Sequence, residues 1–361
     1  MKLAFVNFYS GFAERGGETY VDSLAKELTK KHEVYVFQAG QKNTKRPFSV
    51  KVIKTSYNPS HFHSHLPVTH LLKRLFIDYF HLKELVFTFK LLPSLFQVKP
   101  DIIFPQNSGW QVLILRAFSS LISAKVVVAG QSGPGWNDKV NLYIKPDIFV
   151  ALTRPQAKWA KKATPWKNQK IVVIPNGVNL SEFSPLGPKR VIDLPEPVIL
   201  AVAAAIKSKR VKDTIRAVSK IKNASLLVLG TGPEEQQEDA LGKNLLGNRY
   251  KRLKVSHSDM PSIYRSSKVF TLCSDSSEAF GIVYLEALAS GLPCVATDDS
   301  SRREILGKTG IYVKDPHDPK EYSDALKQAL KKKTKSTQLS QAEKYSWTKI
   351  AQQYEKILDR K

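Results

Sequence analysis

Two glutamates are the side chains best placed for chemistry in the stretch SDSSEAFGIVYLEALASGLPCVA, residues 274 to 296. Glu278 and Glu286 flank an apolar run that follows a strand-like segment, and we expect a helix to begin near Gly281. The amides of residues 280 to 283 would then be unpaired at a helix N-terminus, where a diphosphate or sugar hydroxyls bind well. The stretch therefore predicts a site for a diphosphate or a sugar, formed by Glu278, Ala279, Phe280, Gly281, Ile282, Val283 and Glu286.

The two carboxylates should have different roles in this site. Glu278 would repel a phosphate, so we expect it to face hydroxyl groups. Glu286 lies between Leu285 and Ala287 inside the helix, where burying a carboxylate is costly without a donor. The two hydroxyls of a ribose would supply that donor. The structural alternative makes Glu286 a buried ion pair and Glu278 a helix cap.

Other loops carry weaker indications. Gly16 and Gly17 end a loop after the first strand and open a helix, which suits a phosphate. The loops at Gly230 and Gly307 each lack a glycine that a dinucleotide fingerprint or a P-loop requires, so we set both chemistries aside.

Metal and disulfide chemistry are not expected. Cys273 and Cys294 lie in apolar stretches typical of buried reduced thiols, which favours a cytoplasmic protein. The four histidines His61, His63, His65 and His70 stand in a polar, proline-bounded context without cysteines or acidic residues. We predict no cofactor and no metal.

Composition allows a globular chain with an anionic partner. Of 361 residues, 42% are hydrophobic and 24% charged, and the formal net charge is +24. Such a charge favours nucleic acid, anionic lipid or phosphorylated small molecules. Basic residues are spread along the chain without a nucleic-acid-binding motif, so no specific nucleic acid is expected.

The elements that position these residues alternate between short strands and helices. Strand-like segments such as KLAFVNF, DIIF and KVVVAG are separated by helices or loops, and the alternation restarts at VILAVAAAI after an irregular, proline-rich segment at 179–197. This pattern predicts two doubly wound α/β domains with parallel sheets. We assign residues 1–178 to the first domain, residues 179–344 to the second, and a final helix, 345–361, to the first.

Residues 66–99 mix leucine and phenylalanine with Lys73, Arg74, Lys83 and Lys90. A long helix packed on the first domain explains this composition. The other explanation is a basic amphipathic helix that contacts the inner face of a membrane.

Several motifs in order resemble a known family. The 274–296 stretch is similar to the donor-site signature of the retaining GT-B glycosyltransferases of family four (glycosyl transferases group 1). VIPNGVNLSEFSP, residues 173–185, resembles the family's interdomain segment, and LVLGTGPE the strand and loop that follow. The likeness extends to GGETYVDSLAKEL and DDSSRREILGKTGIYV.

The resemblance implies roles for individual residues. Glu278 would bind the transferred sugar and Glu286 the ribose of a UDP- or GDP-linked donor. Gly16 and Gly17 would close over the diphosphate from the other domain, across an interdomain cleft. Lys209 matches the lysine that neutralises the leaving phosphates and, with Glu278, forms the expected catalytic pair. The family's arginine is replaced by Ala204, for which Lys207 or Arg210 would compensate.

On the acceptor side, Gln131 stands where the family often has a histidine, and Asn107 is a second candidate. The implied reaction is transfer to an acceptor hydroxyl with retained configuration, by front-face attack and without metal, in surface polysaccharide or glycolipid synthesis. The alternatives are a nucleotide-sugar 2-epimerase and a non-catalytic sugar-nucleotide or nucleic-acid binding protein.

Overall fold

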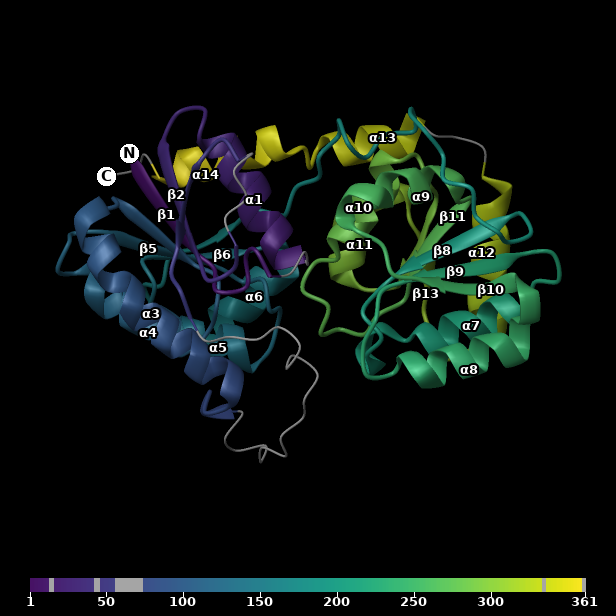
Figure 1. Cartoon of the computed structure of the whole chain (residues 1–361). Coiled ribbons are helices and arrows are strands. Elements are labelled where there is room, and N and C mark those ends of the chain that lie inside the picture. The colour runs from purple at the N-terminus through teal and green to yellow at the C-terminus, as the bar shows by residue number, and fades with distance from the viewer. Residues whose placement is uncertain (13–15, 42–45, 56–73, 333–335, 359–361) are drawn as a thin grey trace. The chain divides into compact units, whose positions relative to one another are not determined.

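The structure, a computed structural model, describes residues 1–12, 16–41, 46–55, 74–332 and 336–358. It consists of two compact units, Met1–Asn176 with Trp347–Lys361, and Gly177–Ser346. Each unit contains one parallel sheet (Figure 1). The two-domain α/β fold predicted from the alternation of strands and helices is confirmed.

The sheet of the first unit has the strand order β3-β2-β1-β4-β5-β6-β7. Its strands are β1 (Lys2–Val6), β2 (Glu33–Gln38), β3 (Ser49–Val52), β4 (Ile102–Pro105), β5 (Lys125–Ala129), β6 (Ile148–Ala151) and β7 (Ile171–Val173). The chain order runs outward from β1 in one direction and from β4 in the other. The loops that leave β1 and β4 therefore lie at the switch point of this sheet, the place where ligands bind in such folds.

Alternating residues of each strand serve the two faces of this sheet, as the period of two requires. Leu3 and Phe5 pack with the helices of residues 16–28 and 347–358 on one face, whereas Ala4 and Val6 pack with the helix of residues 79–98 on the other. The helices are α1 (Gly16–Leu28), α3 (Tyr79–Val98), α4 (Trp110–Ser119), α5 (Trp136–Tyr143), α6 (Arg154–Ala163) and α14 (Trp347–Leu358).

The sheet of the second unit has the order β10-β9-β8-β11-β12-β13. Its strands are β8 (Val198–Val202), β9 (Ser225–Leu229), β10 (Tyr250–Leu253), β11 (Val269–Leu272), β12 (Cys294–Thr297) and β13 (Ile311–Val313). Here the order reverses between β8 and β11, so the loops that leave these two neighbouring strands lie at the switch point. The short strands β10 and β13, both at the edges, were not identified from the sequence.

The helices of the second unit are α7 (Val211–Ser219), α8 (Glu235–Leu246), α9 (Met260–Ser266), α10 (Ile282–Ala289), α11 (Ser300–Leu306), α12 (Pro319–Lys331) and α13 (Ser336–Glu343). The irregular segment 179–197 contains no helix or strand and packs on this unit. Phe183 contacts the rings of His257 and Tyr264, and Arg265 donates to the carbonyl of Pro188 at 2.8 Å.

The final helix, predicted at 345–361, starts later than predicted. The preceding helix α13 ends at Glu343, Tyr345 is not helical, and α14 begins at Trp347. Tyr345 stays with the second unit, where its ring meets Phe280 at 6.3 Å and its hydroxyl donates to the carbonyl of Glu304. Beyond the break, α14 packs on α1 through a buried hydrogen bond between the hydroxyls of Tyr20 and Tyr354.

The predicted 66–99 helix is observed as α3, which begins after the N-cap Asp78. Residues 66–73 and the four histidines 61, 63, 65 and 70 lie outside the described residues. No helix in the described part of the chain has the length and hydropathy needed to cross a membrane. Cys273 and Cys294 are free, buried thiols, and burial raises the pKa of Cys273 to about 12.

Candidate donor site of the second unit

Two loops meet at the switch point of the second unit. One follows β8 and contains a 3-10 turn, Lys207–Lys209; the other follows β11 and leads into α10. The amide of Asp275 donates to the carbonyl of Ser208 at 2.8 Å, which fixes one loop against the other. This contact brings together residues that are far apart in the sequence.

Lys209 and Glu278 form an ion pair across these loops. Lys209 Nζ lies 2.5 Å from Glu278 Oε2, and the two side chains are only 21% and 11% exposed. Limited solvent access leaves their attraction less screened than that of a surface pair. The structure thus brings together the two residues predicted to form the catalytic pair, and joins them directly.

The helix N-terminus beside this pair provides unpaired amides. Gly281 precedes α10 with a φ of 80°, and a Cβ there would lie 2.6 Å from the ring of Tyr284. Glycine is therefore required for the turn into the helix. No side chain caps α10, and within the described residues no backbone carbonyl accepts from the amides of residues 280–283. These amides and the helix dipole suit an anion.

The other predicted donor residues surround this turn. Phe280 is buried and packs on Tyr345, whereas Ala279, Ile282 and Val283 are half-buried. Their backbone amides, rather than their apolar side chains, are the groups that could bind a ligand.

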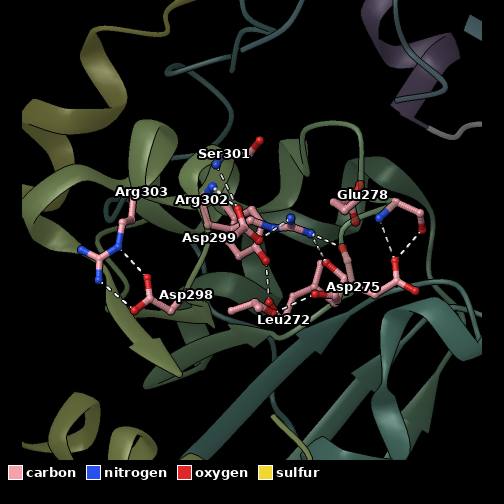
Figure 2. A network of polar contacts seen from close by, with 12 residues as sticks. Leu272, Asp275, Glu278, Asp298, Asp299, Ser301, Arg302 and Arg303 are labelled. Carbon is pink, nitrogen blue, oxygen red and sulfur yellow. Dashed lines mark hydrogen bonds and ion pairs between the residues drawn. The ribbon is translucent and has the colours of Figure 1, made fainter. Parts of the chain in front are cut away.

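A buried arginine supports the loop from beneath. Arg302 is 2% exposed and donates to Asp299 Oδ2 at 2.6 Å, to Ser274 Oγ at 2.7 Å and to the carbonyl of Asp275 at 2.8 Å. Figure 2 shows its guanidinium directed to the Asp275 loop, whereas Arg303 turns away to Asp298. Arg302 therefore links the start of α11 to the loop that presents Glu278.

Asp275 is a charged member of the same loop. Burial alone would raise its pKa, but hydrogen bonds from the side chain and amide of Ser277, with the charges of Arg210 and Arg302, lower the pKa on balance. The effect of Arg210 on Asp275 places that cation near the site. Lys207, the other candidate to replace the family's arginine, is exposed, and its charge acts on Glu234. Ala204 is exposed and offers no charge.

Glu286 occupies a deeper position one helical turn further on. It is 4% exposed, and its carboxylate accepts from the hydroxyl of Tyr264 at 2.8 Å, with His257 Nε2 3.3 Å from its other oxygen. Burial first, and then the charge of Glu286, raise the pKa of Tyr264, which keeps that hydroxyl protonated as a donor. Both partners of Glu286 have protons to give, so the carboxylate is compensated without a ligand.

The first unit holds the remaining predicted residues. Gly16 and Gly17 begin α1 after β1, and among the described residues a Cβ at Gly17 would meet no atom within 4 Å.

Asn107 follows β4 at the switch point, and its side chain is hydrogen-bonded within the protein. It accepts from the amide of Phe8 at 3.0 Å and from Gln111, and it donates to Glu84 Oε1 at 3.3 Å. This arrangement supports a structural role. Gln131 follows β5. Its side-chain amide donates to Asn176 Oδ1 at 2.9 Å and accepts from Asn176 Nδ2 at 3.0 Å.

Four candidate functional residues were not identified from the sequence. Arg302, His257 and Tyr264 lie far in the chain from the glutamates that they contact, and nothing in their local sequence indicated a role. Asp138, in the first unit, is buried and accepts from the amides of Ser132 and Gly133; burial raises its pKa to about 8. Within the described residues, no group of three or more His, Cys, Asp or Glu side chains is arranged to hold a metal.

The chain matches two family profiles in succession. Residues 15–182 match Glycosyltransferase Family 4, and residues 186–345 match Glycosyl transferases group 1. The chain belongs to the family-four glycosyltransferases. The second profile covers Lys209, Glu278 and Glu286.

Curated relatives match parts of this family-four chain. It is 30% identical over 173 residues to N-acetyl-alpha-D-glucosaminyl L-malate synthase of Bacillus anthracis, covering 45% of each chain. It is 26% identical over 204 residues to a probable sucrose-phosphate synthase of Thermosipho melanesiensis, covering 53% of this chain and 48% of the relative. The matched region thus spans under half the length of these relatives.

A solved structure matches the whole fold. HepE of Anabaena, solved in complex with UDP and glucose, aligns over 100% of both chains with a TM-score of 0.77 and 15% sequence identity. The likeness shows that this family-four chain has the GT-B fold.

Proposed function

We propose that the protein transfers a sugar from a nucleoside diphosphate sugar to an acceptor hydroxyl. The observation that carries this proposal is the Lys209–Glu278 pair at the switch point, next to the unpaired amides that open α10. A cation and a helix N-terminus suit a diphosphate, and a carboxylate suits sugar hydroxyls. Membership of the family supports the same reaction class.

Donor binding would use the ion pair without breaking it. An ammonium has three donors, so Lys209 can hold Glu278 with one and phosphate oxygens with the others. Glu278, with its second oxygen, would accept from hydroxyls of the sugar. The pair would thereby set the position of the sugar relative to the phosphate.

The main barrier in such a reaction is departure of the nucleoside diphosphate, on which negative charge develops. Donors already in place where the charge appears lower that barrier most. We assign this role to Lys209, the α10 amides and Arg210, whose charge already reaches the loop at Asp275. With these groups neutralising the diphosphate, we propose a metal-independent reaction.

We also propose that the reaction retains the configuration of the sugar, by attack on the face from which the diphosphate leaves. Glu278 is held by Lys209, which makes it a poor candidate for a covalent nucleophile. As separate parts of the proposal, the acceptor hydroxyl belongs to a surface polysaccharide or glycolipid intermediate, and the donor carries uridine or guanosine.

The proposal is tested first by ligand binding. Thermal unfolding with UDP, GDP, ADP, dTDP or NAD at fixed salt would show which nucleotide binds, because a ligand at about 100 times its Kd stabilises by ~2.7 kcal/mol. A rise with one nucleoside diphosphate supports a donor site and identifies its base. Unchanged curves with all five would contradict it.

Turnover is tested with Lys209→Ala. Release of the nucleoside diphosphate should slow by on the order of 100-fold or more, because the variant lacks a cation at the leaving group. Lys251→Ala is a matched control. Lys251 lies on β10, and its ammonium pairs with the exposed Asp193 at 3.4 Å. Near-normal turnover of Lys209→Ala would overturn the assignment.

A sugar-nucleotide sensor is the second candidate, favoured by Ala204, which leaves an exposed methyl where the family has an arginine. A donor that binds and is never turned over, even with Lys209 present, would support the sensor.

A further inference from the structure

The helix α3 has an exposed apolar stripe along its length. Leu82, Val86, Phe89 and Phe96 are 46, 45, 56 and 53% exposed. With the exposed Pro93, they recur at intervals of three or four residues, so they share one face of a helix about 30 Å long. The opposite face packs on the sheet through Phe87, Leu91 and Leu95. This helix is therefore apolar on both sides.

The neighbouring helix α4 repeats the pattern. Trp110 and Leu113 are exposed on it, and Leu121, just beyond its end, is 74% exposed. Leu115 joins the same core as the buried residues of α3, so α3 and α4 cover the same side of the sheet (Figure 1). Soluble monomers seldom leave an apolar surface of this extent uncovered. We call the outer faces of α3 and α4 the apolar face.

Aromatic rings paired with cations adjoin this face. The Arg74 guanidinium lies 5.5 Å from the ring of Trp136, and the Lys145 ammonium 5.0 Å from that of Trp166. Both connect to the helices: Trp136 donates to the carbonyl of Arg74, shortly before α3, and Arg116 of α4 donates to the carbonyl of Lys145. Tryptophan and basic residues around an apolar centre are typical of proteins that sit in a membrane interface.

The charges carried by α3 and α4 are mainly basic. Lys83, Lys90 and Arg116 are the basic residues of these helices, and the one acidic residue on them, Glu84, is buried. Arg116 also pairs with Asp147 at 3.4 Å. A second copy of the chain would bring these cations against each other. An anionic surface would instead be attracted, and that attraction adds to the burial of apolar side chains.

We propose that the apolar face docks on an anionic lipid bilayer, with Phe89, Phe96 and Leu113 entering the headgroup region and the cations contacting lipid phosphates. Leucine and phenylalanine on a helix offer no base-specific hydrogen bonds, which makes nucleic acid a poorer match. The inference concerns the first unit alone and holds whether or not the second unit turns over a donor.

Vesicle binding tests this proposal. The full chain should co-sediment with vesicles of phosphatidylcholine mixed with phosphatidylglycerol, and more weakly with phosphatidylcholine alone. Phe89→Glu with Leu113→Glu should bind at least about 30-fold more weakly, because two apolar side chains are lost to the bilayer and two charges gained.

The matched control is Leu186→Glu with Val191→Glu, which makes the same change of net charge at residues 82% and 93% exposed in the second unit. Its affinity should stay within about threefold of the unmodified chain. A neutral pair on the same stripe, Leu82→Ser with Phe96→Ser, should weaken binding too and covers the case in which the glutamate pair fails to fold.

Three results would overturn the proposal. One is absence of vesicle binding by the unmodified chain. Another is an equal loss in the two glutamate pairs, which would make the attraction one of net charge. The third is a dimer, measured by light scattering, that Phe89→Glu with Leu113→Glu dissociates.

Discussion

Replacing Arg302 by methionine should destabilise the second unit more than any surface change on the same helix. The guanidinium is buried and makes hydrogen bonds of 2.6, 2.7 and 2.8 Å to Asp299, Ser274 and the carbonyl of Asp275. Methionine fills similar space but leaves these three acceptors in place. Breaking a buried pair by removing one partner costs about 3–5 kcal/mol.

The lower end of that range applies here. The side chain of Asp299 is 28% exposed, so water replaces part of what Arg302 supplied. Asp299 also keeps its contacts to the amides of Ser301 and Arg302 as the N-cap of α11. We therefore expect a loss of about 3 kcal/mol, which lowers the melting temperature of a unit of this size by roughly 6–12 °C.

Arg303→Met is the control, because the same residue type is lost from the same helix. Its side chain is 57% exposed and pairs with Asp298, so solvent screens this ion pair and its loss should leave the melting temperature nearly unchanged. Thermal unfolding measures both variants, and titration with UDP measures the site. Arg302→Met should bind UDP about tenfold more weakly because the Glu278 loop loses its support. Equal melting temperatures for the two variants would refute the reasoning.

Two further predictions concern buried carboxyl groups. The pKa of Asp138 is raised from 3.8 to about 8 by burial, so the folded chain holds a proton that the unfolded chain has lost between these values. The stabilisation is complete below pH 3.8 and is lost as the pH rises towards 8, by up to about 1.4 kcal/mol per pH unit. Asp138→Asn should flatten this dependence in unfolding experiments between pH 5 and 8, and parallel curves would contradict it. Glu286→Gln should reduce the preference for UDP over 2′-deoxy-UDP about tenfold, because a ribose hydroxyl loses a charged acceptor. An unchanged preference, measured by calorimetry, would leave Glu286 as only a structural partner of Tyr264 and His257.

The sequence alone determined the elements and much of the site's local chemistry. The alternation of buried strands and helices can be recognised from the spacing of apolar residues along the chain, and this alternation predicts the two parallel sheets. The start of α10 next to Gly281 is equally local, because the turn depends on a glycine and on the apolar run that follows. The edge strands β10 and β13 were missed because they lack a sustained apolar run: β10 contains the half-buried Lys251 and Arg252, and β13 has only three residues.

Only the tertiary structure decided what the candidate residues touch. Lys209 meets Glu278 because β8 and β11 are neighbours in the sheet, an order that no local pattern encodes. Arg302 was assigned no role from the sequence, yet the fold buries it beneath the Glu278 loop. The break at Tyr345 has the same origin. A helical period continues through it, but contacts with Phe280 and Glu304 hold that residue on the second unit while α14 packs on the first. Secondary structure follows from side chains a few residues apart, whereas the pairing of distant charges depends on strand order and on which groups the packed core deprives of water.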